Sequence, residues 1–67
     1  MENRIRELRK AAGLRQEDLA RLLGVTRQTI HAIENNKYDP TLSLAFRLAA
    51  QLEVTVDELF APGKAGL

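Results

Sequence analysis

The segment from Val25 to Lys37, VTRQTIHAIENNK, combines the apolar spacing of a short buried helix with a high density of hydrogen-bonding side chains. Ile30 and Ile33 lie three residues apart, which places both on one face of a helix. The polar side chains between and around them are those of Arg27, Gln28, Thr29, His31 and Asn35. Guanidinium and carboxamide groups make paired hydrogen bonds to base edges and phosphate groups. The chemistry of this segment would therefore be recognition by hydrogen bonding.

The direction of each side chain follows from the helical period. Successive residues turn by about 100°, so the inward direction is set by Ile30 and Ile33. The residues that then point outward are Gln28, His31, Ala32 and Asn35, with Arg27 on the flank near the N-terminus. In a major groove, Gln28 could bond an adenine edge, Arg27 a guanine edge or a phosphate, and Ala32 could meet a thymine methyl.

Other chemistries find little support in the sequence. His31 is the only histidine and there is no cysteine, so we expect no metal site. His31 could bond a base or a phosphate, or be an exposed histidine without a role. The neighbouring acids in 17–18 and 57–58 would diverge by about 100° on a helix and cannot share a catalytic site. With no nucleophile–base pair and no phosphate-cradling glycine loop, we expect no enzyme and no cofactor.

Size and charge narrow the choice further. A chain of 67 residues can form one small domain, and its core must be filled mainly by Leu, Ile, Val and Ala. The absence of cysteine is compatible with a reducing cytoplasm, and we expect no segment that spans a membrane. The net charge of +1 is polarised, with +3 in residues 1–38 and −2 in residues 39–67. Such polarity is expected where one end meets a polyanion.

Helical stripes and their stop signals predict an all-α domain of five helices in residues 1–62, followed by a flexible tail in 63–67. The first helix is expected over about residues 3–12, and the second from Gln16 to a stop at Gly24. Three threonines, Thr26, Thr41 and Thr55, are expected to open the remaining helices. Asn36 can adopt the left-handed conformation that ends the third. The fourth helix is expected to bury Leu42, Ala45, Leu48, Ala49 and Leu52.

The second and third helices form a predicted helix-turn-helix over residues 16–35. Ala20 is small enough for two helices to cross closely, and Gly24 supplies the turn between them. Ile30 and Ile33 then seat the second helix of the pair on the first. Such a helix can lie in the major groove of double-stranded DNA, with its N-terminal residues at the base edges.

The stretch LRQEDLARLLGVTRQTIHAIENNK resembles the phage-repressor-type helix-turn-helix proteins, also called Cro-like or XRE-like. Its continuation, NKYDPTLSLAFRLAAQLEVTVDELF, is similar to the later helices of short, single-domain bacterial regulators of this group. The resemblance covers about residues 3–60. It implies a lambda-repressor-like DNA-binding domain whose members regulate transcription.

The resemblance also implies roles for individual residues. The expected base contacts are Arg27, Gln28, His31 and Ala32, and the expected phosphate contacts are Arg15, Gln16, Thr29, Asn35, Asn36, Lys37 and Tyr38. Gln16 would present the free N–H groups of a helix start to a phosphate. Arg15 stands where the family usually has a capping Ser or Thr, so we expect it to bind a phosphate instead of capping the helix. Arg9 and Glu34 match an arginine and a glutamate that pair in relatives.

A single module reads few base pairs, so we expect a homodimer on a palindromic operator, acting as a repressor. The spare apolar residues lie late in the chain, and the predicted dimer interface comprises Leu52, Val54, Val56, Leu59, Phe60 and also Leu67. These residues could instead close the core of the monomer. No small-molecule ligand is evident. The alternative function is a protein-binding adaptor or antitoxin-like module whose DNA binding is secondary.

Overall fold

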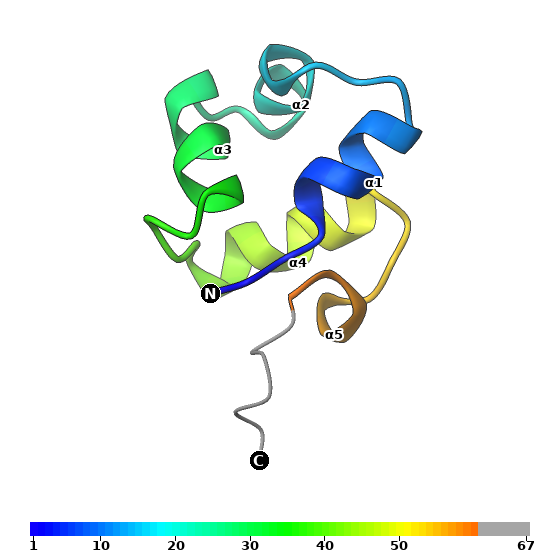
Figure 1. Cartoon of the computed structure of the whole chain (residues 1–67), viewed down its shortest axis with the longest axis vertical. Helices are drawn as coiled ribbons and strands as arrows, with labels where there is room; N and C mark the ends of the chain where they lie inside the picture. Colours follow the sequence, from blue (N-terminus) through cyan, green and yellow to red (C-terminus); the bar gives the residue numbers. More distant parts are fainter. Residues whose placement is uncertain (61–67) are drawn as a thin grey trace.

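A computed structural model describes residues 1–60 and folds them into five helices, which confirms the predicted all-α class (Figure 1). The helices are α1 (Ile5–Ala11), α2 (Gln16–Leu23), α3 (Arg27–Glu34), α4 (Leu42–Gln51) and α5 (Val56–Leu59). The predicted tail in 63–67 and the end of the predicted domain at 61–62 lie outside the described residues. None of the described helices is both long and apolar enough to cross a lipid bilayer.

The threonine caps lie where the sequence predicts them. Thr26 accepts a hydrogen bond from the Thr29 backbone N–H at 3.2 Å and opens α3. Thr41 accepts from the Leu44 N–H at 3.1 Å and opens α4. At α5, Thr55 forms a reciprocal capping box with a glutamate three residues later. Each cap satisfies a backbone donor that the helix itself leaves without a partner.

Left-handed residues end four of the helices. Gly13, Gly24 and Asn36 have φ of 76°, 71° and 60°, and the expected left-handed stop at Asn36 is confirmed. At Asn36, the Lys37 N–H reaches back to the Ala32 carbonyl at 2.9 Å, as in the Schellman motif. The fourth such residue, Glu53, also has φ of 60° and follows α4, although glutamate is not a residue type that predicts this conformation.

The first helix is shorter than the predicted 3–12 because its flanks make other bonds. Asn3 forms an antiparallel bridge with Phe60, and the Arg4 N–H donates to the Leu59 carbonyl at 2.8 Å. These bonds tie the N-terminal segment to the end of α5 and keep it out of the helix. At the other end the helix stops at Ala11, one residue before the predicted end, and Ala12 is exposed.

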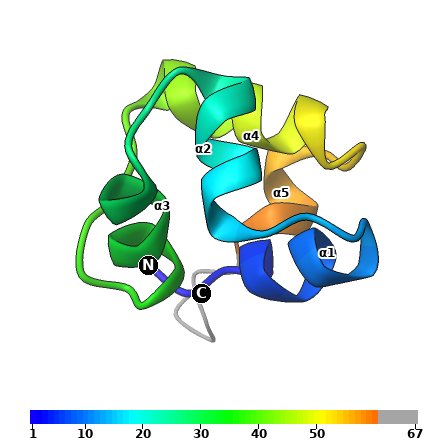
Figure 2. The ribbon, with the colours of Figure 1, turned by 90° about the horizontal axis from the view of Figure 1, so that it is seen from above.

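The core lies where all five helices converge. α2 packs most extensively against α3, and Figure 2 shows α2 in the middle, with α3 on one side and α1 on the other. The buried apolar side chains are Ile5, Leu19, Ala20, Leu23, Ile30, Ile33, Leu44, Ala45, Leu48, Ala49, Leu52, Leu59 and Phe60. This cluster anchors both helices of the predicted helix-turn-helix.

One inward residue was wrongly predicted in α4. Leu42 is 71% exposed, and Leu44, two residues later, is buried in its place. The inward stripe of α4 is centred about 90° around the helix from Leu42, which also lies in the first turn. Phe46 follows Leu42 by one turn and is 58% exposed. Leu42 and Phe46 therefore form an exposed apolar surface on the flank of α4, outside its inward stripe.

Candidate nucleic-acid interface

The α2–α3 pair has the geometry of a helix-turn-helix. Ile30 and Ile33 of α3 are fully buried in the same apolar cluster as Leu19 and Ala20 of α2. Between the helices, Gly24 takes a left-handed conformation, and the next residue donates its backbone N–H to the Ala20 carbonyl at 3.0 Å. The inward role predicted for the two isoleucines and the turn predicted at Gly24 are therefore present in the structure.

The predicted base-contacting residues lie on the solvent-facing side of α3. Arg27, Gln28 and His31 are exposed, and Ala32 is half-buried. Thr29, a predicted phosphate contact, is also half-buried, and its hydroxyl lies 3.0 Å from that of the cap residue Thr26. The start of α3 thus exposes a guanidinium and a carboxamide to solvent, while Ile30 and Ile33 on its inward face are buried in the core.

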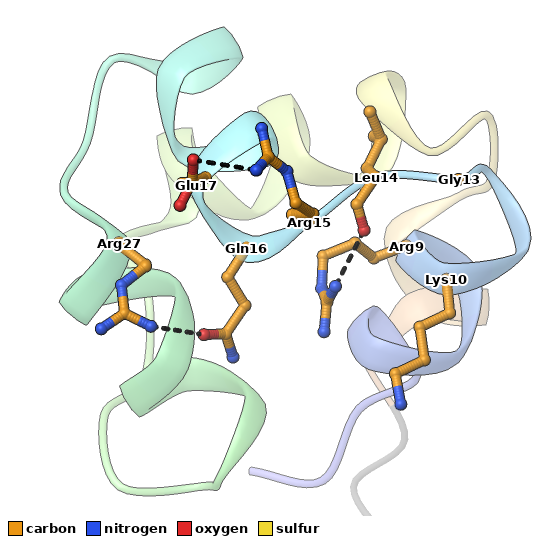
Figure 3. Close-up of a pocket in the computed structure, with 8 residues that line it drawn as sticks. All are labelled: Arg9, Lys10, Gly13, Leu14, Arg15, Gln16, Glu17 and Arg27. Carbon is orange, nitrogen blue, oxygen red and sulfur yellow. Dashed lines mark hydrogen bonds and ion pairs between the residues drawn. The ribbon is translucent and has the colours of Figure 1, made fainter.

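Gln16 and Arg27 approach each other across the helix-turn-helix. Gln16 is the first residue of α2, and its side-chain oxygen accepts a hydrogen bond from Arg27 Nη1 at 3.5 Å (Figure 3). Its amide nitrogen donates to Glu34 Oε1 at 3.0 Å. Both ends of this amide are therefore engaged, and Gln16, a predicted phosphate contact, is hydrogen-bonded to Arg27, a predicted base contact.

Glu34 and Arg9 form the buried ion pair that the resemblance implies. Arg9 Nε donates to Glu34 Oε2 at 2.7 Å, and Arg9 Nη1 donates to the Leu14 carbonyl at 2.8 Å. Burial by itself raises the pKa of Glu34, but the hydrogen bonds from Arg9 and Gln16, the charge of Arg9 and the bond from Arg6 together lower that pKa below its ordinary value. The carboxylate is therefore ionised at neutral pH and joins α1 to the end of α3.

A basic hollow of about 400 Å³ opens beside the start of α2 (Figure 3). Its lining comprises Arg9, Lys10, Gly13, Leu14, Arg15, Gln16, Glu17 and Arg27. Four of these residues are cationic and one is acidic. The start of α2 also carries backbone N–H groups without helical partners and the positive end of the helix dipole, and both attract negative charge. The hollow therefore favours an anion. Lys10 was absent from the predicted contacts, although it follows Arg9 and Arg6 on the same helix.

Arg15 opens α2 without a side-chain cap of its own, because a guanidinium has no acceptor atom. Instead, the Asp18 carboxylate accepts from the Arg15 backbone N–H at 2.9 Å and from its Nε at 3.1 Å. The side-chain hydrogen bond, followed by the backbone one, lowers the pKa of Asp18 to about 2. Glu17 lies 3.3 Å from the same guanidinium. Part of the Arg15 side chain is thus occupied within α2.

The residues after α3 have different surroundings. Asn36, Lys37 and Tyr38 are exposed, as phosphate contacts require. Asn35 is half-buried, its side-chain oxygen accepts from Arg6 Nη2 at 3.0 Å, and its nitrogen donates to the His31 carbonyl at 2.8 Å. Arg6 was not among the predicted site residues. Its link to Asn35 crosses from α1 to α3 and could not be read from local spacing.

Comparison with known proteins places this geometry in a family. The helix-turn-helix family matches residues 5–59, which include all five helices. The chain belongs to the XRE-like helix-turn-helix family. An HTH-type transcriptional regulator of Methanocaldococcus jannaschii is 50% identical over 60 residues, which cover 90% of this chain and 91% of that protein. An HTH-type transcriptional regulator of Bacillus subtilis, YgzD, is 40% identical over 60 residues, which cover 90% of this chain and 91% of that protein.

Solved structures support the same assignment for this helix-turn-helix protein. The restriction-modification controller protein C.AhdI of Aeromonas hydrophila superposes with a TM-score of 0.77 at 40% identity, over 85% of this chain and 83% of that chain. A hypothetical transcription factor from Neisseria, NHTF, superposes with a TM-score of 0.75 at 34% identity, over 87% of this chain and 68% of that chain. The chain is a transcriptional regulator with a helix-turn-helix DNA-binding domain.

The predicted dimer interface of this regulator needs correction. Leu52, Leu59 and Phe60 are 9%, 0% and 6% exposed, since they close the core of the monomer. They leave almost no surface for a partner. Val54 and Val56 are half-buried and keep part of their surface accessible. Leu67 lies outside the described residues. An apolar surface is exposed instead on α4 and at the N-terminus, a position that helical periodicity alone could not distinguish from the core.

Proposed function

We propose that this protein is a repressor that reads a palindromic operator through the major groove as a homodimer. The observation that carries the proposal is the joint exposure of the polar start of α3 and the basic hollow at the start of α2, linked by the Arg27–Gln16 contact (Figure 3). Phosphates line the edges of a DNA groove and base edges form its floor, so the start of α3 and the basic hollow could both be engaged at once. Repression then requires only occupancy of the duplex.

The side chains that would face DNA divide into base contacts and phosphate contacts. Gln28 and Arg27 meet base edges, because both are exposed at the start of the helix that would enter the groove. Gln16 and Lys10 face one DNA backbone from the basic hollow, and Lys37 faces the other after α3. His31, Ala32, Arg15, Thr29, Asn36 and Tyr38 keep the base or phosphate roles expected from the resemblance.

The dimer would use an apolar surface made by Met1, Leu42, Phe46 and Val56. Met1, Leu42 and Phe46 are 52%, 71% and 58% exposed, and contiguous exposed apolar side chains mark interaction surfaces. Beside them lies a groove of about 270 Å³ lined by Met1, Asp39, Pro40, Leu42, Ala45, Val56 and Phe60. A second copy is the occupant that the operator requires, because two half-sites lie about one DNA turn, or 34 Å, apart.

Selection of bound duplexes from a random pool tests the DNA-reading part. We expect a two-fold symmetric site to emerge. Gln28→Ala should relax one position in each half-site, because an adenine contact is lost, whereas Lys37→Ala should weaken binding to all sequences alike. Recovery of no common sequence, or relaxation at no position in Gln28→Ala, would contradict direct reading by α3.

Sedimentation at micromolar concentration tests the dimer. We expect the wild-type protein to sediment as a dimer and Phe46→Ser as a monomer, because the substitution places a hydroxyl in an apolar contact. Leu22→Ser is the matched control, since Leu22 is 53% exposed on α2 and lies outside the proposed surface. A monomeric wild-type protein, or a Phe46→Ser variant that remains dimeric, would refute this interface.

A further inference from the structure

One buried carboxylate touches all three helices that carry the proposed DNA contacts. The Glu34 side chain is fully buried at the end of α3. From α1 it accepts hydrogen bonds from Arg9 at 2.7 Å and from Arg6 at 3.4 Å. From α2 it accepts the Gln16 amide at 3.0 Å. The additional bonds satisfy acceptor sites that Arg9 leaves open on a buried carboxylate, and they also hold the donors in place.

The bond to Glu34 fixes which way the Gln16 amide faces. An ionised carboxylate only accepts hydrogen bonds, so the NH₂ group of Gln16 must be the end that meets it. The amide oxygen is then turned toward Arg27, from which it accepts a hydrogen bond (Figure 3). One N–H of Gln16 and most donors of the Arg27 guanidinium remain available to DNA. Without the carboxylate, the amide could face either way.

The same carboxylate acts on the other end of α3. Arg6, which donates to Glu34 through Nε, donates through Nη2 to the side-chain oxygen of Asn35 at 3.0 Å. Asn35 is half-buried beyond the last turn, and its side chain is held by Arg6 from α1 and by the His31 carbonyl within α3. Hydrogen bonds therefore link Glu34 to side chains at both ends of α3.

We propose that Glu34 is a positioning residue for DNA reading, which orients the Gln16 amide and, through it, the Arg27 guanidinium. The proposal rests on the proposed function and adds a determinant of specificity that has no contact with DNA. Groups held in the binding orientation before DNA arrives lose less conformational freedom on binding. The advantage applies to the operator, where Arg27 must meet one particular base or phosphate, and much less to an arbitrary duplex.

Charge and positioning predict opposite effects for Glu34→Gln. The substitution removes a negative charge near the phosphates, so electrostatics alone would strengthen binding to any duplex. Loss of positioning would weaken binding to the operator, because the amide of Gln16 and the side chain of Arg27 become free to take other orientations. The ratio of operator affinity to scrambled-duplex affinity separates the two effects.

The experiment measures that ratio at one fixed salt concentration for three proteins. For Glu34→Gln, shown to be folded by circular dichroism, we expect the ratio to fall about tenfold, the size of a lost oriented contact. Glu7→Gln is the matched control, because it removes the same charge from an exposed carboxylate, which within residues 1–60 pairs with Arg4 at 3.1 Å. Its ratio should equal that of the wild type. An unchanged ratio in folded Glu34→Gln would overturn the proposal.

A double-mutant cycle tests whether Glu34 acts through Gln16. Adding Glu34→Gln to Gln16→Met should cause little further loss of operator affinity, whereas additive losses would overturn the pathway. If Glu34→Gln does not fold, the same cycle between Gln16→Met and Arg27→Met replaces it, with additivity again as the refuting result. A wild-type protein that does not distinguish operator from scrambled duplex would overturn the proposed function itself, before any variant is compared.

Discussion

Replacement of Glu34 by alanine measures how strongly the buried ion pair holds the fold. The substitution leaves Arg9, whose side chain is only 8% exposed, with the Leu14 carbonyl as its remaining partner. Removing one member of a buried pair costs about 3–5 kcal/mol, because the other charge stays buried. The whole free energy of unfolding for 67 residues is about 3–10 kcal/mol. We therefore expect Glu34→Ala to lose a third or more of its stability.

Urea unfolding followed by circular dichroism gives the free energy from the transition midpoint and slope. Glu7→Ala is the control, and it should leave the midpoint nearly unchanged because exposed pairs contribute little. The double variant Arg9→Met with Glu34→Leu should recover much of the loss, since no uncompensated charge is left buried. A loss below about 1 kcal/mol in Glu34→Ala, the range of exposed pairs, would refute the reasoning.

Three other measurements follow from the structure. The pKa of Glu34 in the folded protein lies below its ordinary value of 4.5. The contribution of Glu34 to stability should therefore be complete above pH 4.5 and should fall as the pH drops through the lower, folded-state pKa. A urea midpoint that does not change on acidification would contradict this. Glu53→Gly should raise the unfolding free energy by up to about 1 kcal/mol, because it relieves a left-handed side chain, and a lowered urea midpoint would refute it. With about eight phosphates contacted by a dimer, log operator affinity should fall with log salt at a slope of about −7; a slope near zero would remove the electrostatic part.

The sequence by itself determined the features that depend on neighbouring residues. Thr26 and Thr41 could be identified as caps because a cap bonds a backbone group two or three residues away. The stop at Asn36 and the buried face of Ile30 and Ile33 are likewise properties of one turn of helix. From these elements the five-helix class and the outward polar face of α3 could be predicted without knowledge of any long-range contact.

The tertiary structure decided what periodicity leaves open. Whether Leu42 or Leu44 lies inward depends on which elements cover each side of α4, and the apolar pattern fits both. Burial of Leu59 in the monomer, rather than at a dimer interface, depends on the N-terminal segment that closes over α5. The bonds that bring Gln16 and Arg6 to Glu34 join residues 18 and 28 positions apart. Local spacing carries no record of such distances, because packing alone brings these groups together.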